Sequence, residues 1–153
     1  MTRAANPRTP AFRRGRRRRL ALYVVSALLL GSALPTLALR AAHADPAQWL
    51  GWTAWSMKLH GAAAFAALFL LGTLWPTHMR AAWLRRHNRL AGGMFAAATA
   101  VTVATGYGLY YFNGETLRSV SDGLHWGSGL AAAWLFVVHR RAGRREGRRG
   151  SGL

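Results

Sequence analysis

Four long apolar runs dominate the chain, and polar residues are concentrated between them. The runs span about residues 20–39, 52–75, 92–112 and 122–139. A helix of about 20 apolar residues matches the thickness of the hydrocarbon core of a bilayer. Because the connections between the runs are short, neighbouring helices are expected to pack antiparallel. The pattern therefore predicts an all-α, integral membrane four-helix bundle.

The basic residues are distributed as a membrane topology signal. The 153-residue chain has a formal net charge of +17, which in a soluble protein of this size would indicate nucleic acid as the partner. Eight arginines precede Leu20, four lie at 80–89 and six at 140–149. Basic loops are retained on the cytoplasmic side of a membrane. We therefore expect a multi-pass protein of the bacterial inner membrane with both termini cytoplasmic, the lipid bilayer as its partner and no binding of nucleic acid.

Three segments follow from this distribution. Residues 1–19 are expected to form a basic, disordered cytoplasmic arm, residues 20–141 the transmembrane domain, and residues 142–153 a basic cytoplasmic tail. The first run and the AHA sequence at 42–44 also resemble a secretory signal with its cleavage site. The run is longer than the core of a usual signal, which favours an uncleaved anchor. Cleavage would leave three helices in the same orientation.

Histidines supply the candidate chemistry. Ionisable residues in membrane helices are costly and usually functional, and four lie in or at the ends of the runs: His60, His78, His125 and His139. His60 and His125 are expected at similar depth in the outer half of the membrane, and we call them the outer pair. His78 and His139 mark the inner ends of the same helices, two and four, and form the inner pair. On an α-helix, residues 18 apart share a face and residues 14 apart lie about 40° from one another.

Facing imidazoles with small residues beside them suit a porphyrin held between two helices. The positions four and seven residues after the outer histidines are all small: Ala64, Ala67, Gly129 and Ala132. Without cysteine the chain cannot hold an iron–sulfur cluster or a covalent C-x-x-C-H haem. We therefore expect non-covalent haem b, one or two per chain. The expected metal ligands form two axial pairs, His60 with His125 and His78 with His139.

A second interpretation of these histidines stays open. A membrane histidine can hydrogen-bond across a helix interface, and His78 and His139 stand beside arginines, where an interfacial cation is ordinary. Pairing of these two also requires tilt or a kink at Pro76, because the histidine spacings on helices two and four correspond to about 27 and 21 Å of α-helix. His43 and His87 fall in expected loops and are expected to be solvated.

Polar groups near the outer surface are candidate partners of haem propionates, which cations can bind. They are Lys58, Arg118 and Trp126. An outer lysine is equally an ordinary anchor at the membrane interface. Asp122 precedes His125 by one turn and could either accept the imidazole N–H or cap the fourth helix. Gly106 and Gly108 in the third run would let a porphyrin edge approach.

Five motifs resemble a known family. They are KLHGAAAF at 58–65, WPTHM at 75–79, RRHNRLAGG at 85–93, TGYGLYY at 105–111 and LHWGSGL at 124–130. Over residues 20–141 their order is similar to that of small bacterial cytochrome-b-like membrane proteins of the flavinylation-associated cytochrome type. The resemblance implies haem b ligated between helices two and four by the histidines named above. It also implies electron transfer across the membrane to or from a flavoprotein or a quinone.

Electron transfer is the function that these features favour, more than an enzyme acting on its own. The chain has no P-loop, zinc motif or dinucleotide fingerprint and no nucleophile–base arrangement. Two other functions stay open. One is a haem-free membrane scaffold or accessory subunit whose histidines only pack. The other is a small transporter or metal-permease component, which would need more polar residues along a path.

Overall fold

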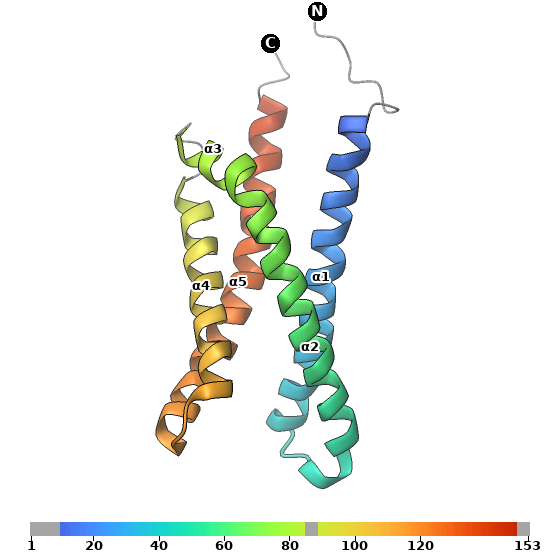
Figure 1. Cartoon of the computed structure of the whole chain (residues 1–153), viewed down its shortest axis with the longest axis vertical. Helices are drawn as coiled ribbons and strands as arrows, with labels where there is room; N and C mark the ends of the chain where they lie inside the picture. The colour runs from blue at the N-terminus through green and yellow to red at the C-terminus, as the bar shows by residue number, and fades with distance from the viewer. Residues whose placement is uncertain (1–9, 85–88, 150–153) are drawn as a thin grey trace, which may run out of the picture. The chain divides into compact units, whose positions relative to one another are not determined.

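The computed structural model describes residues 10–84 and 89–149, and within these ranges the chain is helical and contains no strand (Figure 1). This confirms the all-α class for the described residues. In chain order the helices are α1 (Pro10–Ala41), α2 (Pro46–Leu74), the π-helix η1 (Trp75–Met79), α3 (Arg80–Leu84), α4 (Arg89–Tyr111) and α5 (Glu115–Arg149).

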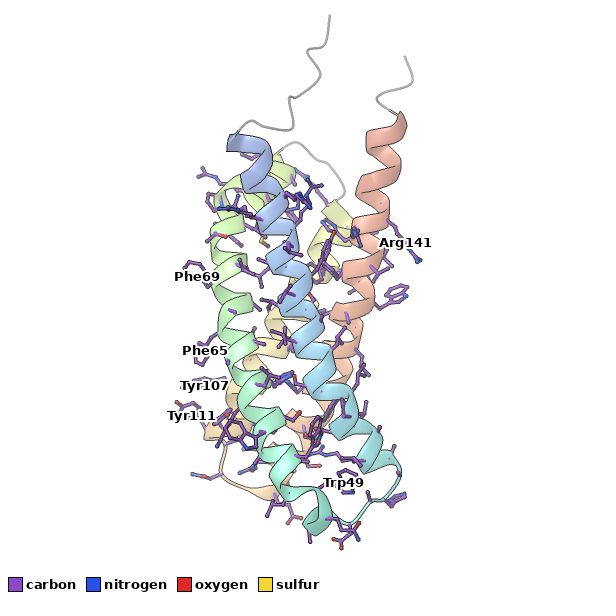
Figure 2. The ribbon with its side chains drawn as sticks, turned by 90° about the vertical axis from the view of Figure 1, so that its right-hand side faces the viewer. Trp49, Phe65, Phe69, Tyr107, Tyr111 and Arg141 are labelled. Carbon is purple, nitrogen blue, oxygen red and sulfur yellow. The ribbon has the colours of Figure 1, made fainter. Side chains whose placement is uncertain are left out.

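Three helical segments are long and apolar enough to cross a membrane: Gly15–Ala41, Ala47–Leu74 and Arg89–Tyr111. They correspond to the first three expected spans. The fourth expected span, residues 122–139, lies inside α5 and is not among these three segments. Its mean hydropathy is lower, because serine, aspartate and histidine are interspersed among its apolar residues. Large apolar side chains are exposed on these helices. Phe65 and Phe69, for example, project from one side of α2 (Figure 2) and are 78% and 73% exposed, which is compatible with a lipid environment.

The first helix begins earlier than its apolar run. α1 starts at Pro10, so residues 10–19, expected to be part of a disordered arm, are helical and that part of the prediction is wrong. Proline is favoured in the first turn of a helix and arginine is a good helix former, so the basic segment extends the apolar helix. Arg18 also donates from Nη2 to the Thr73 carbonyl, 2.8 Å away on α2. Residues 1–9 of the expected arm lie outside the described residues.

The chain divides into two compact units, Met1–Trp75 and Pro76–Leu153. In the first unit, α1 and α2 form an antiparallel hairpin (Figure 1). Ser32 of α1 and Ser56 of α2 are both buried, and the Ser56 hydroxyl donates to the Ser32 carbonyl. Asp45 is the N-cap of α2 and accepts the Ala47 N–H on Oδ1 at 2.9 Å. The hydrogen bond between Ser56 and Ser32 therefore joins the two helices, and Asp45 stabilises the start of α2.

In the second unit, α4 and α5 form another antiparallel hairpin (Figure 1). Gly114 in the connection has a φ of 113°, a conformation that glycine adopts most readily. Thr102 of α4 donates to the Ser128 hydroxyl of α5 at 2.9 Å, and the Phe95 and Phe136 rings pack with centroids 5.9 Å apart. This unit also contains η1 from Pro76 onward and α3. The hydroxyl and aromatic contacts hold the second hairpin together.

The helix that carries His60 does not continue as a regular α-helix to His78. α2 ends at Leu74, and η1 contains both Pro76 and His78. Proline lacks an N–H and its ring clashes with the preceding turn, so an irregularity is expected there, and π-turns are frequent at functional sites. His60 and His78 therefore do not lie on one face of a continuous α-helix, contrary to expectation.

The Asp45 cap provides a test of the first hairpin. Asp45→Ala should lower the free energy of unfolding by about 1 kcal/mol, because an N-cap side chain satisfies a backbone N–H that otherwise loses its partner. The measurement is equilibrium unfolding of the purified protein in mixed detergent micelles, followed by circular dichroism. Asp45→Asn keeps an acceptor oxygen and should unfold like the wild type. An equal loss in both variants would contradict a role for the cap.

Candidate functional site

His60 of α2 is held by α1 within the first hairpin. Its Nδ1 lies 3.2 Å from the Leu29 carbonyl oxygen and 3.0 Å from Ser32 Oγ. A carbonyl oxygen can only accept, so Nδ1 carries the proton. The Ser32 hydroxyl donates its own proton to the Leu28 carbonyl at 2.6 Å and can therefore accept from the imidazole. In a neutral imidazole protonated on Nδ1, the lone pair is on Nε2.

His125 of α5 is held by α4 in the same way. Its Nδ1 lies 3.0 Å from the Thr102 carbonyl oxygen and 3.3 Å from Thr105 Oγ1. The Thr105 hydroxyl donates to the Val101 carbonyl at 2.7 Å. Here too Nδ1 is the donor, and Nε2 carries the lone pair. Both outer histidines are thus held through Nδ1–H by oxygens of the preceding helix.

The two hairpins share a sequence signal for this arrangement. A buried serine lies four residues before each histidine, in an S-x-x-L-H motif at 56–60 and 121–125. The partners on the preceding helices were missed by the sequence analysis: Leu29, Ser32, Thr102 and Thr105. The available signal was a hydroxyl residue inside an otherwise apolar run. Because a polar side chain among hydrocarbon needs a partner inside the protein, such residues are candidates for contact with the histidines.

The inner pair is brought together in the second unit. His78 of η1 and His139 of α5 have ring centroids 6.0 Å apart, with the ring planes at 83°. Phe95 of α4 stacks on the His139 ring at 6.3 Å with an interplanar angle of 14°. A Cβ at Gly92 would lie 3.6 Å from His139 Cε1, an ordinary van der Waals distance, so α4 contacts the His139 ring at this position as well. The two rings are therefore neighbours within this unit, and their pairing as ligands of one haem stays a prediction.

The 6.0 Å between the ring centroids of His78 and His139 is within the range of an edge-to-face contact between two rings, and it is also close to the separation of two imidazoles that bind one metal ion. Metal–nitrogen bonds are about 2 Å long, and an imidazole centre lies roughly 1 Å from its nitrogens, so two opposed ligands have centroids about 6 Å apart. The described residues contain no group of three or more His, Asp or Glu side chains that could hold a metal ion. A tetrahedral zinc site would need more protein ligands than two. Haem iron, by contrast, needs as few as two ligands from the protein.

The outer pair belongs to two different units. His60 is anchored in the first hairpin and His125 in the second, and the pairing of the two stays a prediction. Of the small residues expected beneath these histidines, Gly129 faces α4, where a Cβ would lie 3.8 Å from the Thr102 methyl carbon. Each outer histidine is therefore fixed within its own hairpin, and its role as a metal ligand stays a prediction.

Gly106 and Gly108 of α4 both lie against side chains of their own unit. A Cβ at Gly106 would lie 3.1 Å from His125 Cε1, and one at Gly108 would lie 3.2 Å from Ser121 Oγ. The space beside both glycines is thus filled by side chains of the same unit. The approach of a porphyrin edge to these glycines stays a prediction. Gly106 lets the His125 ring pack directly on α4.

The remaining candidates lie at the surface or within helices. Lys58 is exposed on α2, with Nζ 4.7 Å from the centre of the Trp55 ring, a contact that suits an interfacial anchor. Arg118 is exposed near the start of α5. Asp122 lies inside α5, which begins at Glu115, so its interpretation as an N-cap is wrong. His43 is exposed in the connection after α1, as expected, whereas residue 87 lies outside the described residues.

Packing of His125 on Gly106 can be tested with two alanine variants. Alanine at Gly106 or at the exposed Gly127 raises helix propensity equally. At Gly106 the added methyl must displace His125, so Gly106→Ala should be less stable than Gly127→Ala by about 1–3 kcal/mol. Nothing lies within 4 Å of a Cβ at Gly127. Equal free energies of unfolding in detergent would contradict the close contact.

Comparison of the chain with known protein families, curated proteins and solved structures finds no match. The site's own geometry therefore carries the functional argument. It consists of two histidines fixed by Nδ1 in separate hairpins and of a third and fourth whose rings are 6.0 Å apart.

Proposed function

We propose that the protein is a membrane b-type cytochrome that carries electrons across the bacterial inner membrane through haem b held between helices two and four. These helices are α2 with its continuation η1, and α5. The observation that carries the proposal is the 6.0 Å separation of the His78 and His139 rings, which suits one iron between two axial imidazoles. The resemblance to flavinylation-associated cytochromes supports haem b and points to a flavoprotein or a quinone as redox partner.

The chain's own residues would bind and insulate the cofactor. Haem b supplies a one-electron redox centre when bound. His78 and His139 would be the axial ligands near the cytoplasmic side, and His60 and His125 those near the outer side, each outer histidine coordinating through Nε2. The apolar helices exclude water, and Lys58 and Arg118 would neutralise propionates at the outer surface. The protein would bind one haem if one histidine pair ligates iron and two haems if both pairs do.

The proposed topology has α5 as the fourth span and both termini in the cytoplasm. It is supported by the arginines that precede Leu20 and by those at 80–89 and 140–149, all of which fall on one side in a four-span arrangement. It is also supported by exposed tryptophans near the expected membrane surfaces, at Trp52 and Trp75, which are 55% and 62% exposed.

A haem-free scaffold is the second candidate function. The hydrogen bonds from the Nδ1 atoms of His60 and His125 are also those that a purely packing histidine makes across a helix interface. The two functions differ in whether the purified protein contains haem.

Haem content in the wild type and in ligand variants tests the proposal. A pyridine haemochrome assay against protein mass should give two haems per chain if both pairs bind and one if a single pair binds. His139→Ala removes an axial bond, so the ratio should fall by one, while His43→Ala, an exposed loop control, should leave the visible spectrum unchanged. A haem-free wild type from haem-replete cells would favour the scaffold. Full low-spin haem in both His78→Ala and His139→Ala would remove the inner pair as ligands.

Reporter fusions test the topology. A reporter fused after Leu153 should be active only if it is one that works in the cytoplasm, and one inserted at Asn113, between α4 and α5, should report the periplasm. The reason is the retention of arginine-rich loops on the cytoplasmic side. The reverse pattern would overturn the proposed orientation.

A further inference from the structure

We propose that Ser32 and Thr105 are positioning residues that fix the outer histidines through one repeated hydrogen-bond arrangement, the Nδ1 clamp. The clamp consists of a backbone carbonyl and of a hydroxyl three residues later on the preceding helix, both accepting from Nδ1–H. It sets the tautomer and the basicity of His60 and His125. The effect on redox potential rests on the proposed function, whereas the clamp itself does not.

The donor and acceptor roles within the clamp follow from the distances. In the first hairpin, Ser32 Oγ is 2.6 Å from the Leu28 carbonyl and 3.0 Å from His60 Nδ1. A hydroxyl has a single proton, and the shorter contact to a carbonyl takes it. The hydroxyl lone pairs are then left for the imidazole N–H. The Leu29 carbonyl at 3.2 Å is the second acceptor, so the N–H is shared between two oxygens.

The second hairpin repeats this arrangement with a different side chain. Thr105 Oγ1 is 2.7 Å from the Val101 carbonyl and 3.3 Å from His125 Nδ1, and the Thr102 carbonyl is 3.0 Å from the same nitrogen. Serine in one hairpin and threonine in the other share only the hydroxyl and its position. Packing alone would not require a hydroxyl at both places. The repeated feature is therefore the acceptor for Nδ1–H.

The clamp has a chemical consequence for a metal ligand. Donation from Nδ1–H to an acceptor raises the basicity of the ligating Nε2. With haem held by His60 and His125, a more basic imidazole would stabilise the oxidised iron, so the clamp would lower the midpoint potential and removal of one acceptor would raise it. The hydroxyl is the nearer acceptor of His60 and the carbonyl the nearer acceptor of His125. Loss of Ser32 Oγ should therefore shift the potential more than loss of Thr105 Oγ1.

Redox titration of the haem-loaded protein, followed by its visible spectrum, tests this consequence. Thr105→Val keeps the shape and removes the hydroxyl, and it should shift the midpoint potential to a more positive value with the low-spin spectrum retained. Ser32→Ala should give the larger positive shift. Thr105→Ser keeps the hydroxyl and should restore the wild-type potential. Thr99→Val is the matched control on the same helix, since that hydroxyl donates to the Phe95 carbonyl at 2.8 Å.

A second measurement does not need haem. Nitrogen-15 NMR of the imidazoles in protein produced without haem should show His60 and His125 protonated on Nδ1. Removal of the hydroxyl should move the Nδ1 proton resonance upfield and speed its exchange in Ser32→Ala and Thr105→Val, but not in Thr99→Val. An Nε2-protonated wild type, or proton resonances unchanged in both hydroxyl-deleted variants, would overturn the clamp. A wild type that shows the Nδ1 tautomer but never binds haem would overturn the proposed function alone.

Discussion

An imidazole placed among hydrocarbon must find its hydrogen-bond partner inside the protein, because lipid offers none. Both hairpins are organised around this requirement. The most buried side chains in the described part of the chain include the three serines Ser32, Ser56 and Ser121, whereas Phe65 is 78% exposed. This distribution is the opposite of a soluble core, where large apolar side chains are buried. Serines are buried where the helices meet, together with a few apolar side chains such as Leu135, while many large apolar side chains are exposed.

The helical class and three apolar spans could be predicted because run length and composition are local properties of the sequence. Helix ends were harder to predict. α1 and α5 begin at Pro10 and Glu115, outside the apolar runs, because charged residues with good helix propensity extend a helix beyond the apolar segment. The partners of His60 and His125 depend on how each helix is rotated against its neighbour. A helix that is apolar on all sides does not specify that rotation.

The inner histidines show a different limit of sequence reasoning. A proline between His60 and His78 indicates an irregular turn, but not its type. The turn is a π-helix at Trp75–Met79, and His78 within it lies beside His139 of α5. Counting residues along an ideal α-helix gave spans of different length on helices two and four. The α-helical rise does not apply to the whole segment between His60 and His78, because Trp75–Met79 is π-helical.

The Nδ1 clamp also has a consequence for biogenesis. In each hairpin, oxygens of the first helix accept the Nδ1–H of the histidine on the second helix. The hydrogen bonds of His60 Nδ1 can therefore form before the second hairpin is synthesised. Neither imidazole has to wait for a cofactor to complete the hydrogen bonding of Nδ1. Under the proposed function, the nascent chain can therefore leave the translocon one hairpin at a time and accumulate as a stable apoprotein. Haem would then not be needed to satisfy the Nδ1 hydrogen bonds of either hairpin.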